Sequence, residues 1–346
     1  MSIEVVNIRK RFGSTQALDG MSFTVHSGKL FGFVGSNGAG KTTTMRIILG
    51  VLEPDSGDVL SDGAPLTFTD RQNFGYMPEE RGLYPKMNVG EQLIYLARLH
   101  GLSKDEATSK MKLWTERLGI AQRRNDPVQT LSLGNQQRVQ LAAALIHEPQ
   151  VMILDEPFSG LDPLAVADMS AVLKEKVEQG SIVLFSSHQL DLVERLCDEV
   201  GICSQGKIVA KGTIDELRTT ADTYYDVTTG EDSRLLAGYL SGTALRADDA
   251  TAQTRQLPHL ETQILDSHSL RVKLPANIND QNLLRAALDV GTVHGFERFR
   301  PHLNELFANV VSTAPAPQPA EVQTPKRRFL IGRHAAATPL STSQEA

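Results

Sequence analysis

The stretch that decides the fold of this chain is Gly35-Ser36-Asn37-Gly38-Ala39-Gly40-Lys41-Thr42. It fits the pattern G-x-x-x-x-G-K-[ST] and lies between an apolar run, residues 30–34, and residues 43–49, the strand–loop–helix context that the pattern requires. Small residues let backbone N–H groups point at phosphate oxygens, and the helix beginning near Lys41 adds the positive end of its dipole. Lys41 contributes a full charge, and Thr42 is placed to put its hydroxyl on Mg²⁺. The matching flanks argue against a glycine-rich turn before an ordinary helix, so the stretch predicts a phosphate-binding loop.

Length and composition indicate an ordinary soluble globular protein. The 346 residues allow one large domain or two moderate ones, and 40% hydrophobic with 22% charged residues is typical of this class. No run of about 18 apolar residues is present to span a bilayer, and residues 1–10 do not read as a signal peptide, so we expect a cytoplasmic location. The net charge of −6 argues against a general nucleic-acid binder, and the two cysteines, Cys197 and Cys203, suit a reducing compartment.

Strands precede the phosphate loop, and helices follow it. Residues 3–8 and 21–25 read as short strands, the second with the alternation of a half-buried strand. Between them Phe12 could stack on a nucleotide base, although a lone aromatic is more often packed in a core or a turn. Residues 89–100 and 103–119 read as helices, and a capping box opens the second. This helical segment separates the loop from the next motif.

The second motif is Leu131-Ser132-Leu133-Gly134-Asn135-Gln136-Gln137-Arg138. Ser132 is placed as an N-cap, and apolar residues then repeat at helical spacing as far as Ile146. A helix N-terminus with free N–H groups at residues 132–134 would form a second anion site. A capped amphipathic helix without such a role explains the octet equally well, so the octet by itself leaves both interpretations open.

Two carboxylates follow a predicted buried strand. Residues 151–154 form a continuous apolar run, as a buried parallel strand requires, and Asp155 and Glu156 come directly after it. The C-terminal end of such a strand lies at the crevice where α/β folds bind ligands. We therefore expect Asp155 to hold Mg²⁺, usually through water, and Glu156 to face the attacking water. With a phosphate loop upstream, we favour this reading over two solvated acids.

Another apolar strand, residues 181–187, brings His188 to the same edge of the sheet. A lone histidine is more often structural than catalytic. At a strand end beside the Asp155 strand, however, its side chain can reach a γ-phosphate, which favours the functional interpretation. A helix over residues 189–199 and a hairpin over residues 200–210 complete this part of the chain.

Five elements in one order resemble the ATP-binding subunit of ABC transporters: the loop at Gly35, LSLGNQQR at Leu131, VMILDEP at Val151, SGLD at Ser159, and His188. The resemblance covers roughly residues 3–217. It implies an α/β P-loop NTPase with an antiparallel β subdomain and a helical insert. It also implies a head-to-tail dimer, in which ATP on Lys41 of one copy is closed over by Ser132 and Gly134 of the other.

The resemblance assigns roles to single residues. By it Glu156 polarises water, His188 holds the γ-phosphate, Asp162 couples the two sites, and Phe12 stacks on adenine. ATP and Mg²⁺ are the implied cofactors. The implied nucleotide-binding residues are Phe12, Gly35, Ser36, Asn37, Gly38, Ala39, Gly40, Lys41, Thr42, Thr43, Ser132, Gly134 and Gln136. The implied metal-binding residues are Thr42, Asp155 and Glu79.

Two departures from the family's pattern matter. Glu79 stands where Gln is usual, and a carboxylate there adds negative charge near the phosphates unless Mg²⁺ compensates. The second motif has Leu133 and Asn135 where Ser or Gly types are commoner, which leaves backbone donation from Gly134 unaffected. Both variants look like those of the exporter branch that is similar to sodium and drug efflux subunits.

Three regions are predicted along the chain. Residues 1–218 form the nucleotide-binding domain, with the helical insert at about 86–150. Residues 222–311 form a small accessory α/β domain, like the one that follows the nucleotide domain in that exporter branch. Residues 312–346 are rich in Pro, Ala, Thr and Ser and are predicted to be a disordered tail.

The function that the resemblance implies is ATP hydrolysis that powers export of a solute, such as an ion or a drug, through a separate membrane permease. We expect a homodimer, or a heterodimer with a similar ATPase, peripheral on the cytoplasmic face of the cell membrane, and no nucleic-acid partner. The alternative is a non-transport ABC ATPase acting on ribosomes or nucleic acid. A single nucleotide domain and the acidic charge balance argue against that alternative.

Overall fold

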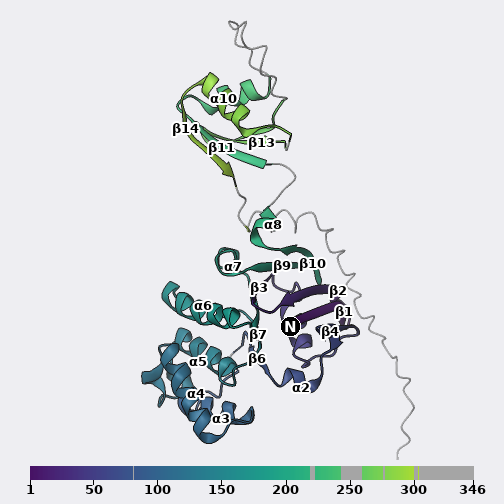
Figure 1. Ribbon diagram of the computed structural model, residues 1–346, viewed down its shortest axis with the longest axis vertical. Coiled ribbons are helices and arrows are strands. Elements are labelled where there is room, and N and C mark those ends of the chain that lie inside the picture. The colour runs from purple at the N-terminus through teal and green to yellow at the C-terminus, as the bar shows by residue number, and fades with distance from the viewer. Residues whose placement is uncertain (81, 219–222, 243–258, 276, 300–302, 304–346) are drawn as a thin grey trace, which may run out of the picture. The chain divides into compact units, whose positions relative to one another are not determined.

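A six-stranded sheet organises the first part of the chain (Figure 1). The computed structural model describes residues 1–80, 82–218, 223–242, 259–275, 277–299 and 303. β10 pairs antiparallel with β9, and the other neighbouring strands pair in parallel. In sheet order the strands are β10 (Lys207–Gly212), β9 (Glu199–Ser204), β3 (Lys29–Val34), β8 (Ile182–Ser187), β7 (Val151–Leu154) and β6 (Phe74–Met77).

Alternate side chains of this sheet enter two separate hydrophobic cores. On β3, Leu30 and Val34 enter one core, and Phe31 and Phe33 enter the other. The apolar residues of β7 and β8 divide in the same way, and every residue of these two strands is buried. A strand has a two-residue period, and here both faces of the sheet are covered. This is why the sequences of these strands read as continuous apolar runs.

Helices α5, α6 and α7 contribute to the first core. α6 (Pro163–Glu178) begins at Asp162, whose Oδ1 accepts the Ala165 N–H at 2.8 Å. α7 (Leu190–Leu196) is shorter than the helix predicted over residues 189–199. The chain becomes extended at the end of α7 because Asp198 is hydrogen-bonded to the start of β3. The Asp198 N–H donates to the Leu30 carbonyl at 2.9 Å, and Asp198 Oδ2 accepts the Leu30 N–H at 2.8 Å.

An antiparallel sheet covers the second core, together with α1 (Lys41–Ile48). Its strands pair up to the turn between Phe12 and Thr15, and they therefore extend beyond the predicted residues 3–8 and 21–25. The antiparallel β subdomain is thus confirmed. In sheet order its strands are β2 (Thr15–His26), β1 (Ser2–Phe12), β4 (Ser56–Ser61) and β5 (Ala64–Pro65).

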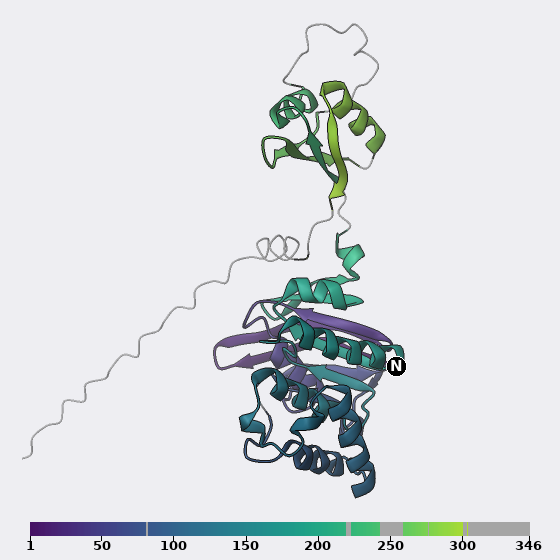
Figure 2. The ribbon, with the colours of Figure 1, turned by 90° about the vertical axis from the view of Figure 1, so that its left-hand side faces the viewer.

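The helical insert is also confirmed. It contains α3 (Val89–Leu99), α4 (Lys104–Arg117) and α5 (Leu133–Leu145), which the two views of Figures 1 and 2 show gathered at one end of the part of the chain that contains the six-stranded sheet. The predicted capping box opens α4, since Ser103 Oγ accepts the Glu106 N–H at 3.3 Å and the Glu106 carboxylate accepts the Ser103 N–H at 2.9 Å. Shorter helical segments are α2 (Phe68–Arg71), α8 (Ile214–Arg218) and two 3₁₀ turns at Ala121–Arg123 and Val128–Thr130.

A further sheet with its own core follows, in the order β12-β13-β11-β14 with antiparallel pairing. The elements that the structure describes in it succeed one another as β-α-β-β-α-β, which is the ferredoxin-like arrangement. β12 and β14 were not predicted, because β12 is short and burial along β14 does not alternate cleanly. The elements are β11 (Thr223–Thr229), α9 (Ser233–Leu240), β12 (Thr262–Ile264), β13 (Ser269–Leu274), α10 (Asp280–Val290) and β14 (Val293–Phe299).

The chain divides into a unit of residues 1–314 and a second unit of residues 315–346. The tail predicted over residues 312–346 lies outside the described residues. Within the described ranges, no helix combines the length and the apolar character needed to cross a membrane.

Candidate functional site

The phosphate loop opens into a pocket of about 400 Å³. The pocket lies where β3 and β7 end, since the C-terminal ends of parallel strands meet at one edge of a sheet. It joins the loop to Glu79, Asp155 and Glu156. The lining residues are Phe12, Thr15, Gln16, Ala17, Asn37, Gly38, Gly40, Lys41, Thr42, Thr43, Glu79, Asp155 and Glu156.

Lys41 is held against the phosphate loop. Its Nζ donates to the carbonyls of Gly35 at 2.7 Å and Ser36 at 3.2 Å, and the residue is 8% exposed. Helix α1 begins at Lys41, so the first N–H groups of the helix have no intrahelical partner. Gly40 precedes the helix with φ +103°, and a Cβ there would lie 2.5 Å from Leu18 Cδ2. The loop thus presents a cation and free N–H groups on a backbone that requires glycine.

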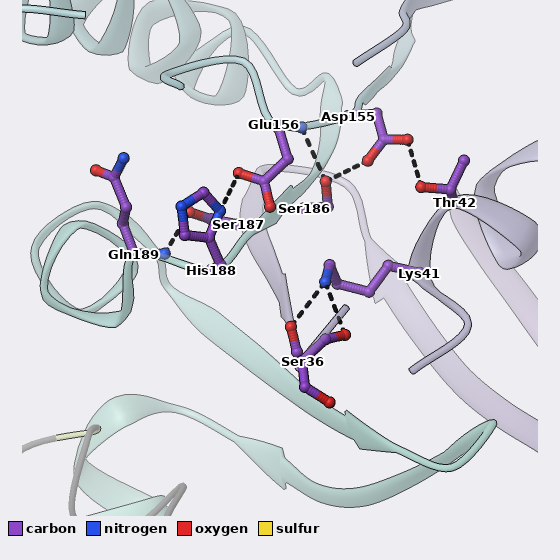
Figure 3. A network of polar contacts seen from close by, with 10 residues as sticks. Ser36, Lys41, Thr42, Asp155, Glu156, Ser186, Ser187, His188 and Gln189 are labelled. Carbon is purple, nitrogen blue, oxygen red and sulfur yellow. Dashed lines mark hydrogen bonds and ion pairs between the residues drawn. The ribbon is translucent and has the colours of Figure 1, made fainter. Parts of the chain in front are cut away.

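Thr42 and Asp155 form the candidate metal position (Figure 3). Thr42 Oγ1 donates to Asp155 Oδ2 at 2.8 Å, and Asp155 is 1% exposed at the end of β7. The exposed Glu79 lines the same pocket. Hydroxyl and carboxylate oxygens are hard donors, and Mg²⁺ in proteins takes one or two of them together with waters and phosphate oxygens. The donor set therefore fits Mg²⁺.

Glu156 and His188 form a pair beside this position. His188 Nδ1 lies 3.0 Å from Glu156 Oε2, and 56% of the imidazole side chain is exposed against 9% of the Glu156 side chain. Burial raises the pKa of Glu156, and His188 and Lys41 oppose part of the rise. Glu156 also has φ +49°, a left-handed backbone that is uncommon for a residue with a Cβ. The pair combines a buried carboxylate base with an accessible imidazole.

Ser186, which was not predicted as a site residue, links the Asp155 carboxylate to the Glu156 backbone. Its hydroxyl donates to Asp155 Oδ1 at 2.5 Å and accepts the Glu156 N–H at 2.8 Å (Figure 3). The only sequence signal for it is that the apolar run of β8 ends in two polar residues, Ser186 and Ser187. These polar residues lie close to Asp155, because β8 pairs with β7, the strand that ends just before Asp155.

The second motif lies outside the lining of this pocket. Ser132 is the N-cap of α5, and its Oγ accepts the N–H of the third helical residue at 3.4 Å. Gln136 is 4% exposed, and its amide donates to the carbonyls of Val128 at 3.1 Å and Leu131 at 3.0 Å, so it holds the preceding turn from the inside. The structure therefore does not bring Ser132, Gly134 or Gln136 to the pocket of their own chain.

Two further predicted residues have distinct places. Phe12 is 50% exposed and lines the pocket, with Lys10 Nζ 5.8 Å from the ring centroid. Asp162 lies outside the lining and caps α6. The pocket also includes residues at the start of β2 that the sequence analysis missed, because no motif marks them: Thr15, Gln16 and Ala17.

Sequence comparisons connect this chain with ABC transporters. The profile of the family described as ABC transporter matches residues 18–159. The ABC transporter ATP-binding protein YhaQ of Bacillus subtilis is 43% identical over 216 residues, which cover 62% of this chain and 72% of that protein. An ABC transporter ATP-binding protein of Alkalihalophilus pseudofirmus is 36% identical over 281 residues, 81% of this chain and 99% of that protein. The linearmycin resistance ATP-binding protein LnrL of Bacillus subtilis is 30% identical over 318 residues, 89% of this chain and 97% of that protein.

Solved structures of ATP-binding cassettes share the fold. The ATP-binding subunit of an ABC transporter matches with a TM-score of 0.59 at 32% identity, over 63% of this chain and 92% of that one. A bacterial ABC transporter cassette solved as a dimer matches with a TM-score of 0.56 at 21% identity, over 61% of this chain and 98% of that one. The phosphate loop, the strand-end carboxylates and these similarities lead to one conclusion: the chain belongs to the family of ABC transporter ATP-binding proteins and carries an ABC ATPase domain that binds ATP.

Proposed function

We propose that this chain is the ATP-hydrolysing subunit of an ABC exporter, working as a dimer with a separate membrane permease. One observation carries the enzymatic part of the proposal. A single pocket holds the Lys41 loop, the Thr42–Asp155 pair and the buried Glu156, which is paired with His188. These are the parts that phosphoryl transfer to water needs: a cradle for the phosphates, a position for a divalent cation, and a base.

Nucleotide binding rests on the loop and on Phe12. Backbone N–H groups of residues 35–43 and the Lys41 ammonium bind the β- and γ-phosphates, and the half-exposed Phe12 ring stacks on adenine. Thr42 and Asp155 hold Mg²⁺, with Glu79 as a further oxygen donor. The cation supplies neutralisation of phosphate charge.

Glu156 and His188 act on the water and the γ-phosphate. The raised pKa of Glu156 makes its carboxylate a better proton acceptor than an exposed glutamate, so it orients and polarises the attacking water. His188 Nδ1 faces Glu156, which leaves the other ring nitrogen to contact the γ-phosphate. The pair fixes the base and a phosphate contact relative to each other.

The second motif supports a composite site. Ser132 and Gly134 stand at the N-terminus of the 13-residue helix α5, outside the pocket of their own chain. A head-to-tail second copy would place this helix end against the phosphates bound at Lys41. In such a dimer Asp162, which caps α6 next to the SGLD turn, couples the two sites.

Export is supported by the relatives. One relative that aligns over 89% of this chain is named for linearmycin resistance. We place the chain on the cytoplasmic face of the cell membrane, where it transmits ATP-driven dimer closure to the permease that meets the solute.

The test is purification of a tagged full-length chain from membranes, followed by mass spectrometry and a Mg²⁺-dependent ATPase assay. We expect an integral membrane protein to copurify and ATP to be hydrolysed. Recovery of ribosomes without any integral membrane protein would refute the transport function and favour a non-transport ATPase.

A further inference from the structure

We propose that Ser186 is a positioning residue for ATP hydrolysis. Its buried hydroxyl holds the carboxylate of Asp155, at the metal position, and the backbone N–H of Glu156, whose carboxylate faces the water. This inference rests on the proposed ATPase function and extends it to a residue outside the phosphate loop, the second motif and the strand-end acids.

Strand register places Ser186 next to the two acids. β8 pairs in parallel with β7, and Phe185 lies opposite Leu154, so the next position on each strand brings Ser186 beside Asp155. β8 is flanked by β3 on its other side and is buried along its whole length. Ser186 itself is 0% exposed. A hydroxyl at this depth needs hydrogen-bond partners, because burying it unpaired costs free energy.

The hydroxyl of Ser186 has a donor role and an acceptor role, and both are used. It donates to Asp155 Oδ1 at 2.5 Å and accepts the Glu156 N–H at 2.8 Å. The other oxygen of Asp155, Oδ2, accepts from Thr42 Oγ1 at 2.8 Å. The Asp155 carboxylate is therefore held through both oxygens, one by Ser186 on the neighbouring strand and one by Thr42 of the phosphate loop (Figure 3).

The contact with Glu156 fixes an unusual backbone. The Asp155 N–H continues the pairing with β6 by donating to the Met77 carbonyl at 2.8 Å, whereas the Glu156 N–H turns to Ser186. Glu156 has φ +49°, a conformation that costs free energy in a residue with a Cβ and persists only where neighbouring contacts hold it. Without the Ser186 oxygen, this buried N–H would lack its acceptor, and the backbone would relax.

Relaxation at Glu156 would displace the base. The Glu156 carboxylate lies 3.0 Å from His188 Nδ1, and its direction depends on the backbone angle from which the side chain leaves. A shift of the order of 1 Å in a reacting group lowers rates by about 100-fold in general. Loss of the Ser186 hydroxyl would also leave Asp155 Oδ1 without this hydrogen bond, so the metal position would be less well preorganised.

A merely structural role makes a different prediction. If Ser186 only fills space, its removal should lower thermal stability and leave the Mg²⁺ dependence of nucleotide binding and kcat unchanged. Ser170 provides a matched control. It is also buried, at 4% exposure, and its hydroxyl donates to the Val166 carbonyl within α6, outside the nucleotide pocket.

The experiment compares full-length Ser186→Ala, Ser186→Thr and Ser170→Ala with the parent. It measures thermal unfolding, binding of a fluorescent ATP analogue across a Mg²⁺ titration, and kcat and KM for ATP. For Ser186→Ala we expect analogue binding at saturating Mg²⁺ within about threefold of the parent, a half-saturating Mg²⁺ concentration raised about threefold or more, and a kcat lowered about 10–100-fold. Ser186→Thr keeps the hydroxyl, so its half-saturating Mg²⁺ concentration and its kcat should return most of the way to the parental values. Ser170→Ala should match the parent.

The proposal is overturned if Ser186→Ala keeps the parental kcat and the parental Mg²⁺ titration, or if Ser170→Ala changes both as strongly. It is also overturned if Ser186→Thr folds with the parental unfolding temperature and still behaves as Ser186→Ala does. Absence of ATP hydrolysis by the parent would contradict the proposed function instead. The Mg²⁺ titration of analogue binding would still decide the role of Ser186.

Discussion

At the scale of single residues, the environment of Glu156 sets it apart from other acids of the chain. Its side chain is 9% exposed and contacts His188, and burial raises its pKa, so this carboxylate differs physically from a surface acid. Asp155, its neighbour in the chain, is bonded instead to Thr42 and Ser186. Two adjacent acids thus have different environments, as the different roles proposed for them require.

Replacing Glu156 by Gln should separate binding from hydrolysis. Glutamine keeps the size and the backbone contact but cannot accept the proton of the attacking water. We expect kcat to fall by about 100-fold or more with ATP binding retained, and the ATP-bound dimer to accumulate. Single-turnover assays and size-exclusion chromatography with ATP measure both effects. Turnover at the parental rate would exclude the base role of Glu156.

The pH profile of kcat/KM should report the raised pKa of Glu156. The carboxylate must be deprotonated to act as a base, so activity falls as pH falls through its pKa. Because burial raises that pKa, the acid limb should lie above the value of about 4.3 of an exposed glutamate. His188→Ala removes the partner that lowers the pKa, so its acid limb should move to still higher pH. An acid limb at the same pH in both proteins would show that His188 does not influence the titrating group.

Glu79→Gln tests the charge balance of the pocket. Glu79, Asp155 and Glu156 place three carboxylates around one pocket that also contains Lys41. Removing one negative charge should strengthen ATP-analogue binding in EDTA by about three- to tenfold and affect binding in Mg²⁺ much less, since the cation compensates the charge. Glu80→Gln is the control, because Glu80 is exposed and does not line the pocket. If the ratio of binding in EDTA to binding in Mg²⁺ is the same for the parent and Glu79→Gln, the charge of Glu79 does not affect nucleotide binding.

At the scale of elements, a stacked histidine pair joins the ends of α3 and α5. The rings of His100 and His147 are 3.7 Å apart between centroids with an interplanar angle of 4°. His147 Nε2 lies 3.2 Å from the Phe74 carbonyl at the start of β6, and its Nδ1 has no hydrogen-bond partner among the described residues. The pair therefore links the helical insert to the edge strand of the central sheet.

This pair should make stability depend on pH. Burial, helped by the charge of His100, lowers the pKa of His147 to about 4. An unfolded histidine titrates near about 6.5. Between these values the unfolded chain binds a proton that the folded chain does not, so stability is lost as pH falls below about 6.5, by at most about 1.4 kcal/mol per pH unit.

Urea unfolding from pH 4.5 to 7 checks this dependence. The slope of the free energy of unfolding against pH should be smaller in His147→Phe, which keeps a ring to stack on His100 but cannot titrate. His100→Gln, at an exposed position, should retain most of the slope. Parallel slopes in the parent and in His147→Phe would locate the pH dependence elsewhere.

At the scale of the whole molecule, the pocket and the N-terminus of α5 are separate within one chain. The pocket contains Lys41 and Glu156, and the N-terminus of α5 with Ser132 and Gly134 stands apart from it. In the composite site proposed above, a second copy would supply this helix end, and a closed pair of copies would provide it twice.

Mixing two inactive variants should restore activity if the sites are composite. Lys41→Ala disables the phosphate loop. Gly134→Asp puts a negative charge at the N-terminus of α5, where it stabilises the helix but repels phosphate. A Cβ at residue 134 would be 3.5 Å from Leu161, an ordinary contact, so the second variant should fold. In a mixed dimer one site combines the intact halves, and we expect up to about a quarter of the parental ATPase rate from the mixture. No recovery in the mixture would indicate a site complete within one chain.

Much of this architecture could be predicted because it is encoded locally. The capping box at Ser103 predicted the start of α4, and the apolar runs predicted β7 and β8 because both faces of these strands are covered. Predictions were less accurate where a distant contact overrides local preference. The helix predicted over residues 189–199 ends early, because Asp198 bonds to Leu30 at the start of β3.

The phosphate loop, the strand-end acids and the family could all be predicted from the sequence, since each depends on short patterns whose chemistry is local. Which residues share the pocket, and how the two acids differ, depends on how distant segments pack together. Ser186 and Asp155 are 31 residues apart, and strand register alone makes them neighbours. Burial then raises the pKa of Glu156, an effect that no spacing encodes, because it depends on everything packed around the carboxylate.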